Sequence, residues 1–186
     1  MKRVLLASCL LVAAWALRAQ EAPAAAPAAE ATHECFPLQI AFWPEAPVIQ
    51  IVGREMPVHG LKLNVFSGRN DEVHGLDLGL FSRGNDLRGV QINAGNYVET
   101  EAIGLQVGLI NGTKDLTGLG IGAVNYWDGG TVTGVQVGLA NISSTVTGVQ
   151  IGLFNHCRTM KGVQIGLYNR IETKAIPFFP ILNAAW

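Results

Sequence analysis

Between Gly60 and Asn169, aliphatic residues alternate with glycine or polar residues in a short sequence motif that occurs eight times. A glycine opens each copy, aliphatic residues follow at the second, fourth and sixth places, and the third place is usually Gln. The copy Gly148-Val-Gln-Ile-Gly-Leu-Phe-Asn155 is typical. Alternation with a period of two predicts a β-strand with one face buried. We expect the aliphatic places to form the core stripe, and the Gln and Gly places to form a flat outer face.

The copies recur at nearly constant intervals, which predicts one structural unit per copy. Successive copies start 14 to 16 residues apart. The opening glycines are Gly60, Gly75, Gly89, Gly104, Gly118, Gly134, Gly148 and Gly162. Each connection contains one apolar place shortly before the next glycine, which we expect to face the shared interior. Its residues include Val73, Leu87, Leu116, Val132, Val146 and Met160.

Two sets of amide side chains occupy fixed places in successive copies. The eighth place is Ser67 and Ser82 in the first two copies and Asn afterwards, and we expect the strand to turn there, because Asn tolerates left-handed backbone angles. Stacking of the copies would align the amides in ladders. The predicted ladder residues are Asn96, Asn111, Asn125, Asn141, Asn155 and Asn169, together with Gln91, Gln106, Gln136, Gln150 and Gln164.

Two all-β architectures fit this unit. In a β-solenoid of about eight coils, strands stack in parallel about 4.8 Å apart and place equal residues above one another. In a closed antiparallel outer-membrane β-barrel, each copy would be one strand with its aliphatic residues facing lipid. The uniformly short connections favour the solenoid. The terminal Trp186 is consistent with the barrel, which therefore remains the alternative. A solenoid needs capping strands at both ends, since an open strand edge recruits other strands.

The chain of 186 residues is predicted to hold one folded domain after an export signal. A basic start and the apolar run Val4–Leu17, too short to span a bilayer, are typical of a signal peptide. The predicted segments are a signal peptide at 1–19, an Ala/Pro-rich linker at 20–32, an N-terminal cap at 33–59, the repeat array at 60–175 and a C-terminal cap at 176–186.

Removal of the signal peptide changes the formal charge from −1 to −4, because it takes away three basic residues and no acid. This balance gives no reason to expect nucleic acid as a partner. We therefore expect an exported protein of the periplasm, the outer membrane or the cell surface.

The sequence holds no ordinary catalytic or metal-binding motif. The histidines are far apart along the chain, and His59 and His74 directly precede opening glycines, which is typical of solvated turn residues. Cys35 and Cys157 belong to no Cys-x-x-Cys motif, and two separate thiols are favoured over a disulfide. We expect no metal and no cofactor.

An enzyme is the least favoured function. A hydrolase would need two carboxylates converging on one groove, and the residues that could supply them are Asp71, Glu72, Asp77 and Asp86. The aromatic residues of the array are expected in core and turn packing rather than in a sugar-stacking platform; they include Tyr126, Trp127, Phe154 and Tyr168.

The repeated phrase Gly-Val-Gln-Ile-Gly-Leu-x-Asn, the entry His59-Gly-Leu-Lys-Leu-Asn-Val-Phe66 and the ending Pro180-Ile-Leu-Asn183 resemble a family of exported bacterial surface-repeat proteins. The resemblance covers about residues 36 to 186 and implies bacterial export; it supplies no catalytic residues. We therefore expect a non-enzymatic scaffold of the cell envelope, with an envelope protein, a glycan or the outer membrane as its partner. An integral outer-membrane protein is the alternative.

Overall fold

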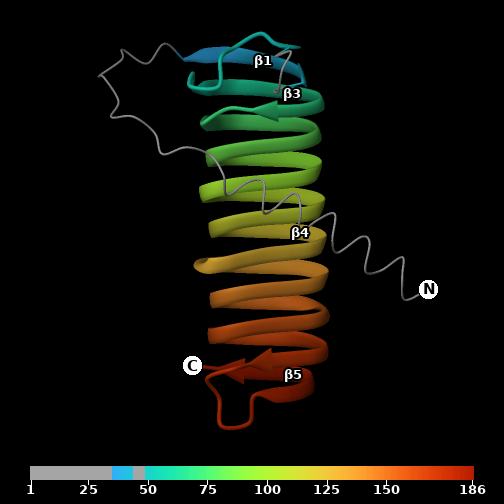
Figure 1. Cartoon of the computed structure of the whole chain (residues 1–186). Helices are drawn as coiled ribbons and strands as arrows, with labels where there is room; N and C mark the ends of the chain where they lie inside the picture. The colour runs from blue at the N-terminus through green and yellow to red at the C-terminus, as the bar shows by residue number, and fades with distance from the viewer. Residues whose placement is uncertain (1–34, 44–48) are drawn as a thin grey trace, which may run out of the picture. The chain divides into compact units, whose positions relative to one another are not determined.

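A computed structural model describes residues 35–43 and 49–186, which form a column of stacked β-coils (Figure 1). The elements are β1 (Phe36–Trp43), β2 (Ile49–Gln50), β3 (Val58–Arg69), β4 (Glu72–Ile171) and β5 (Phe178–Ala185). β4 is one extended segment of 100 residues that winds around the column axis. The predicted signal peptide and linker lie outside the described residues. Within the described ranges, no helix has the length and apolarity to cross a membrane.

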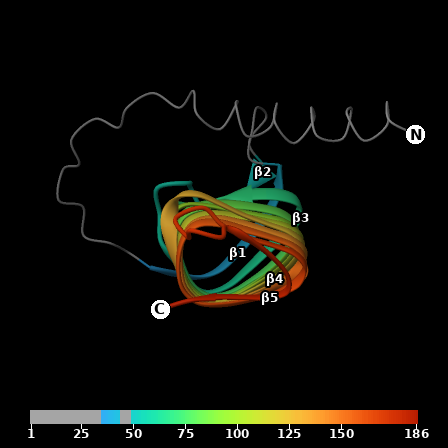
Figure 2. The ribbon, with the colours of Figure 1, turned by 90° about the horizontal axis from the view of Figure 1, so that it is seen from below.

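Neighbouring copies run parallel, with equal places side by side. β3 pairs in parallel with the start of β4, so that Gly60 lies beside Gly75 and Leu63 beside Leu78. The hydrogen bonds between asparagines of adjacent copies join residues 14 to 16 positions apart, which is the copy spacing. Viewed along the axis, the coils superimpose (Figure 2). The predicted β-solenoid is confirmed, and the antiparallel alternative is wrong.

The opening glycines form a column that allows adjacent coils to approach closely. All eight have positive φ, as in Gly134 at 137° and Gly148 at 142°. A Cβ on Gly134 would overlap the carbonyl oxygen of Gly118 in the coil before it, and the other opening glycines of β4 meet their predecessors in the same way. Glycine is therefore required here by its backbone angles and by the coil spacing.

The orientation of the two strand faces is opposite to the sequence prediction. Gln136 and Asn141 have no exposed surface, whereas Leu139 is 58% exposed and Leu167 is 69% exposed. The third, fifth and eighth places point into the column, and the aliphatic fourth and sixth places point outward. The predicted outer face of Gln and Gly is therefore wrong. Alternation establishes that a strand has two different faces, but it does not establish which face is enclosed.

The apolar connection residues do face the interior, as predicted. Val132 and Val146 have no exposed surface, and Leu116 and Met160 are almost fully buried. They pack against the residues that lie two positions after the eighth-place asparagines, among them Trp127 and Cys157. Together these side chains form one apolar cluster along the column axis. The interior thus contains an apolar cluster as well as the rows of amide side chains.

The first copy differs from the second by one extra residue. Ser67 pairs with Phe81, and Gly68 pairs with Ser82, after a shift of register that follows Asn64. Gly68 therefore occupies the eighth place of this copy, and the assignment of Ser67 to that place is wrong.

Both ends of the stack carry additional strands. β1 runs parallel to β3 and places Gln39 beside Lys62, so it continues the stack before the first copy. β2 pairs antiparallel with β1. At the other end, β5 runs antiparallel along the last coil and pairs Ala185 with Gly162. The reversal of direction ends the parallel register of the repeats.

Candidate functional site

The six predicted asparagines form one continuous ladder inside the column. The Nδ2 of each of the first five donates to the Oδ1 of the asparagine in the next copy, over distances of 2.7 to 2.9 Å. All six side chains are buried, none exposing more than 1% of its surface. The predicted single column of asparagines is confirmed. Because a buried polar group needs hydrogen-bond partners, each of these amides depends on the equivalent amide of the neighbouring copy.

The first five ladder asparagines also bond to the backbone of the next copy. Asn125 Nδ2 donates to the carbonyl of Val137 at 3.0 Å, and Asn141 Nδ2 donates to the carbonyl of Ile151 at 3.0 Å. The glycine at the fifth place makes room for these amides. A Cβ on Gly138 would lie 2.8 Å from Asn125 Nδ2 and 3.2 Å from Asn141 Oδ1. Gly at the fifth place and Asn at the eighth are therefore one packing unit.

The glutamine ladder has the opposite hydrogen-bond direction and contains one interruption. Gln164 Nε2 donates to Gln150 Oε1 at 2.8 Å, and Gln150 Nε2 donates to Gln136 Oε1 at 2.6 Å, toward the N-terminus. Gln106 donates to Gln91 in the same sense. The fifth copy has Gly120 at this place, because the buried indole of Trp127 fills the space: a Cβ on Gly120 would lie 2.9 Å from its ring.

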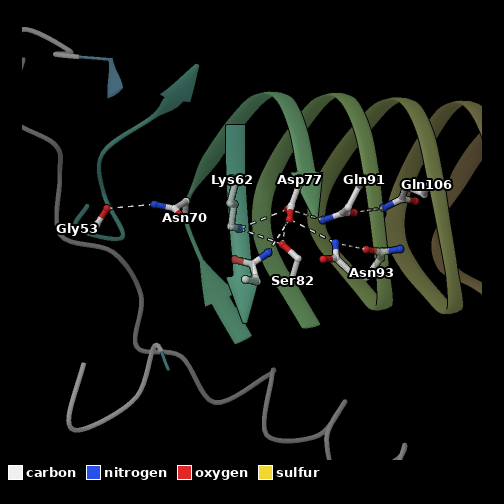
Figure 3. A network of polar contacts seen from close by, with 10 residues as sticks. Gly53, Lys62, Asn70, Asp77, Ser82, Gln91, Asn93 and Gln106 are labelled. Carbon is white, nitrogen blue, oxygen red and sulfur yellow. Dashed lines mark hydrogen bonds and ion pairs between the residues drawn. The ribbon is translucent and has the colours of Figure 1, made fainter. Parts of the chain in front are cut away.

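An ion pair replaces the amides in the first two copies. Lys62 and Asp77 occupy the glutamine place, and the Lys62 Nζ lies 3.5 Å from Asp77 Oδ2 with both side chains fully buried. Asp77 also accepts hydrogen bonds from Asn64, Gln91 and Ser82. Figure 3 shows Lys62, Asp77, Gln91 and Gln106 in one row along the stack. Burial lowers the pKa of Lys62, and the Asp77 carboxylate opposes that shift.

The interior acid Asp77 is closed off from the other acids of the first copies. Asp77 is enclosed and already bonded on both oxygens, so it cannot meet a substrate together with the other acids considered for a hydrolase. No disulfide joins Cys35 and Cys157, both of which lie in the described chain. Burial, assisted by Glu172, raises the pKa of Cys157 to about 12, so that its thiol stays protonated at neutral pH.

The outward-facing aliphatic residues form a continuous apolar face, which we call the aliphatic face. It consists of the fourth and sixth places of the copies and is free of charged and polar side chains at those places. Over the C-terminal copies it is hollowed into a groove of about 680 Å³. The groove is lined by Ile121, Val137, Leu139, Ile151, Leu153, Ile165, Leu167, Ile181 and the intervening glycines Gly122, Gly138, Gly152 and Gly166.

Exposed aromatic side chains lie at the seventh place, next to the aliphatic face. Phe154 is 58% exposed and its ring centroid lies 6.1 Å from that of Tyr168, which in turn lies 4.8 Å from that of Phe178 in β5. Of the aromatics expected in core or turn packing, Trp127 is buried as predicted. Phe154, Tyr168 and Tyr126 are outside the core. Sequence reasoning missed this surface because it assigned the aliphatic places to the interior.

Comparisons with protein-family models, with curated proteins and with solved structures found no match. The resemblance to surface-repeat proteins therefore stays a prediction.

Proposed function

We propose that this protein is a non-enzymatic scaffold of the bacterial cell envelope that associates through its aliphatic face with a second copy of itself. The observation that carries the proposal is the outward orientation of Leu139, Leu153 and Leu167, which are 58%, 44% and 69% exposed. Large apolar side chains in a regular array outside a fold need a partner surface.

The size of the aliphatic face supports an interaction role. Eight coils about 4.8 Å apart, each presenting a strand segment about 13 Å long, give roughly 500 Å² in projection. Soluble monomers rarely expose contiguous apolar patches larger than a few hundred Å². A stable dimer buries ~800 Å² per partner, which is of the same order as this face together with the exposed rings of Phe154 and Tyr168 beside it.

A second copy is the partner that fits the spacing of this face. Its aliphatic rows have the same interval from coil to coil, so the ridges of one face fit the grooves of the other along the whole stack. Two flat apolar sheets pack face to face about 10 Å apart with interdigitated side chains. A lipid bilayer is less favoured, because the exported chain is acidic and lacks electrostatic attraction to anionic headgroups.

The envelope location rests on the N-terminal signal-like segment and on the resemblance to exported surface-repeat proteins. The non-enzymatic role is supported by the burial of the ladder amides, which bond to one another rather than face solvent. Both the location and the non-enzymatic role are inferred from the residues of this chain and not from a matched relative.

Leu153→Glu tests this proposal, with Thr159→Glu as the control from the same copy. Leu153 lines the groove, whereas Thr159 is an exposed residue of the connection. We expect the purified protein to sediment as a dimer. Leu153→Glu should weaken dimerisation by at least about 10-fold, because it places a charge in an apolar interface. Thr159→Glu should leave it unchanged, and circular dichroism should show both variants folded.

Three results would overturn the proposal. The first is a monomeric wild-type protein over the whole concentration range. The second is a dimer that Leu153→Glu does not weaken. The third is a monomer that floats with phosphatidylcholine vesicles, which would make lipid the partner of the aliphatic face.

A further inference from the structure

Three potential metal ligands that are separated in sequence meet on the outside of the first coils. His74 Nε2 lies 2.9 Å from Glu72 Oε1, and His59 Nε2 lies 3.8 Å from the same oxygen. One ligand atom from each of the three residues lies within 4.8 Å of the other two. The side chains are exposed or half-buried, so a metal ion can reach them and the rings can adjust.

The two imidazoles lie at equal places of adjacent coils. His59 and His74 are paired in the parallel register of β3 and β4, and their rings are stacked with centroids 4.5 Å apart. Cys35, one residue before β1, lies beside them, with its Sγ 3.9 Å from His59 Nε2. The cluster thus comes from two adjacent layers, and Cys35 of the preceding layer adjoins it at His59.

We propose that His59, Glu72 and His74 form a zinc site, with Cys35 as its fourth ligand. Neutral imidazole, carboxylate and thiolate are the ligands that Zn²⁺ takes, at about 2.0 to 2.3 Å each. Tetrahedral ligands at those distances are separated by roughly 3.3 to 3.6 Å. The observed separations are close to these values: 2.9 Å for His74–Glu72, 3.8 Å for His59–Glu72 and 3.9 Å for Cys35–His59. A carboxylate and a thiolate also balance the charge of the ion.

An ordinary His–Glu ion pair elsewhere on the solenoid shows what is special about this cluster. His156 Nε2 lies 3.1 Å from Glu172 Oε1, in exposed positions comparable to those of His74 and Glu72. Among the described residues, only the cluster at the first coils brings three His, Cys, Asp or Glu ligands together. The His156–Glu172 pair is therefore a matched control.

The zinc ion would hold the N-terminal end of the stack together. Its ligands come from Cys35 before β1, from His59 in β3 and from Glu72 and His74 at the start of β4. Binding to the folded state alone stabilises it by mass action. The first coils lack the asparagine ladder that joins the later copies, so a metal bridge at this end replaces part of that connection.

Zinc chloride is the probe for this site, added to the purified protein without a histidine tag and with its metals removed. Competition with a chromophoric chelator should show one Zn²⁺ bound per chain. His74→Gln should weaken binding by at least about 100-fold, beyond the effect of losing an outer-shell partner. His156→Gln should leave the affinity unchanged. Cys35→Ser should weaken binding and reduce the protons released on binding, since the thiol must ionise to coordinate.

Hydrogen exchange provides a second readout that does not depend on the variants. Zinc should slow exchange of the backbone amides in β1 and β3 and leave those near His156 unaffected. The proposal is wrong if the protein binds no zinc, or if His74→Gln and His156→Gln weaken binding equally. Unchanged affinity and proton release in Cys35→Ser would remove Cys35 from the ligand set.

Discussion

Gly134→Ala should destabilise the protein by more than about 4 kcal/mol, because two independent costs add at this position. The φ of 137° is disfavoured for any residue with a Cβ, at about 1–3 kcal/mol. The new Cβ would also overlap the carbonyl oxygen of Gly118, which forces adjacent coils apart and breaks their hydrogen bonds. Urea denaturation followed by circular dichroism measures the change in free energy of unfolding.

Two other glycines separate the causes of this effect. Gly53 has no atom within 4 Å of an added Cβ and no positive φ, so Gly53→Ala should be nearly neutral. Gly129 has a φ of 81° but the same free space, so Gly129→Ala should cost only about 1–2 kcal/mol of backbone strain. If Gly134→Ala is no worse than Gly129→Ala, close approach of the coils does not determine the glycine column.

Asn141→Leu should cost roughly 3–6 kcal/mol, although leucine has a similar volume. Asn141 accepts a hydrogen bond from Asn125 and donates to Asn155 and to the carbonyl of Ile151. Leucine leaves those three partners buried with a missing bond, and each such group costs about 1–3 kcal/mol. The change in free energy of unfolding, measured by urea denaturation, tests the expectation.

Asn169→Leu is the control at the end of the same ladder. Asn169 accepts from Asn155 but has no further asparagine after it in the ladder, and its own Nδ2 bonds to the nearby carbonyl of Gly166. We therefore expect about half the loss of stability that Asn141→Leu causes. Equal losses at both positions would show that the bonds of Asn141 to the following copy add nothing to stability.

The stacking of the copies could be predicted because repetition and stacking have the same cause. An amide that bonds to its equivalent in the next coil requires the same residue at the same place, as Asn125, Asn141 and Asn155 show. The burial of Val132 and Val146 was also predictable, because each is the apolar residue shortly before the next opening glycine, in a mostly polar connection. These features depend only on the spacing of the repeat.

The choice of the enclosed face could not be made from alternation, because a period of two has no inside or outside. Hydrophobicity alone assigns Leu139 and Leu153 to the core, whereas hydrogen bonding assigns Gln136 and Asn141 to it. The signal that could have decided is steric. Glycine at the fifth place recurs together with asparagine at the eighth, as in Gly138 and Asn141. This recurrence indicates that the amide occupies the space that a side chain on the glycine would need.

The cluster of His59, Glu72 and His74 was missed because His59 is distant in sequence from the other two, yet the register could have revealed it. His59 and His74 are each one residue before an opening glycine, so parallel stacking places one above the other. Glu72 lies two residues before His74 and its side chain reaches both rings. Linear motif spacing, by contrast, considers ligands of one segment only.

Exchange of the side-chain amide protons of Asn and Gln tests the amide interior most directly. After transfer of nitrogen-15-labelled protein to D₂O, the NH₂ signals of the ladder residues should persist for hours, because their hydrogens are buried and bonded. Asn141→Leu should remove one of the protected pairs and thereby identify the ladder. Loss of all these signals within the dead time of the experiment would show that the amides face solvent, and would contradict the arrangement described for this fold.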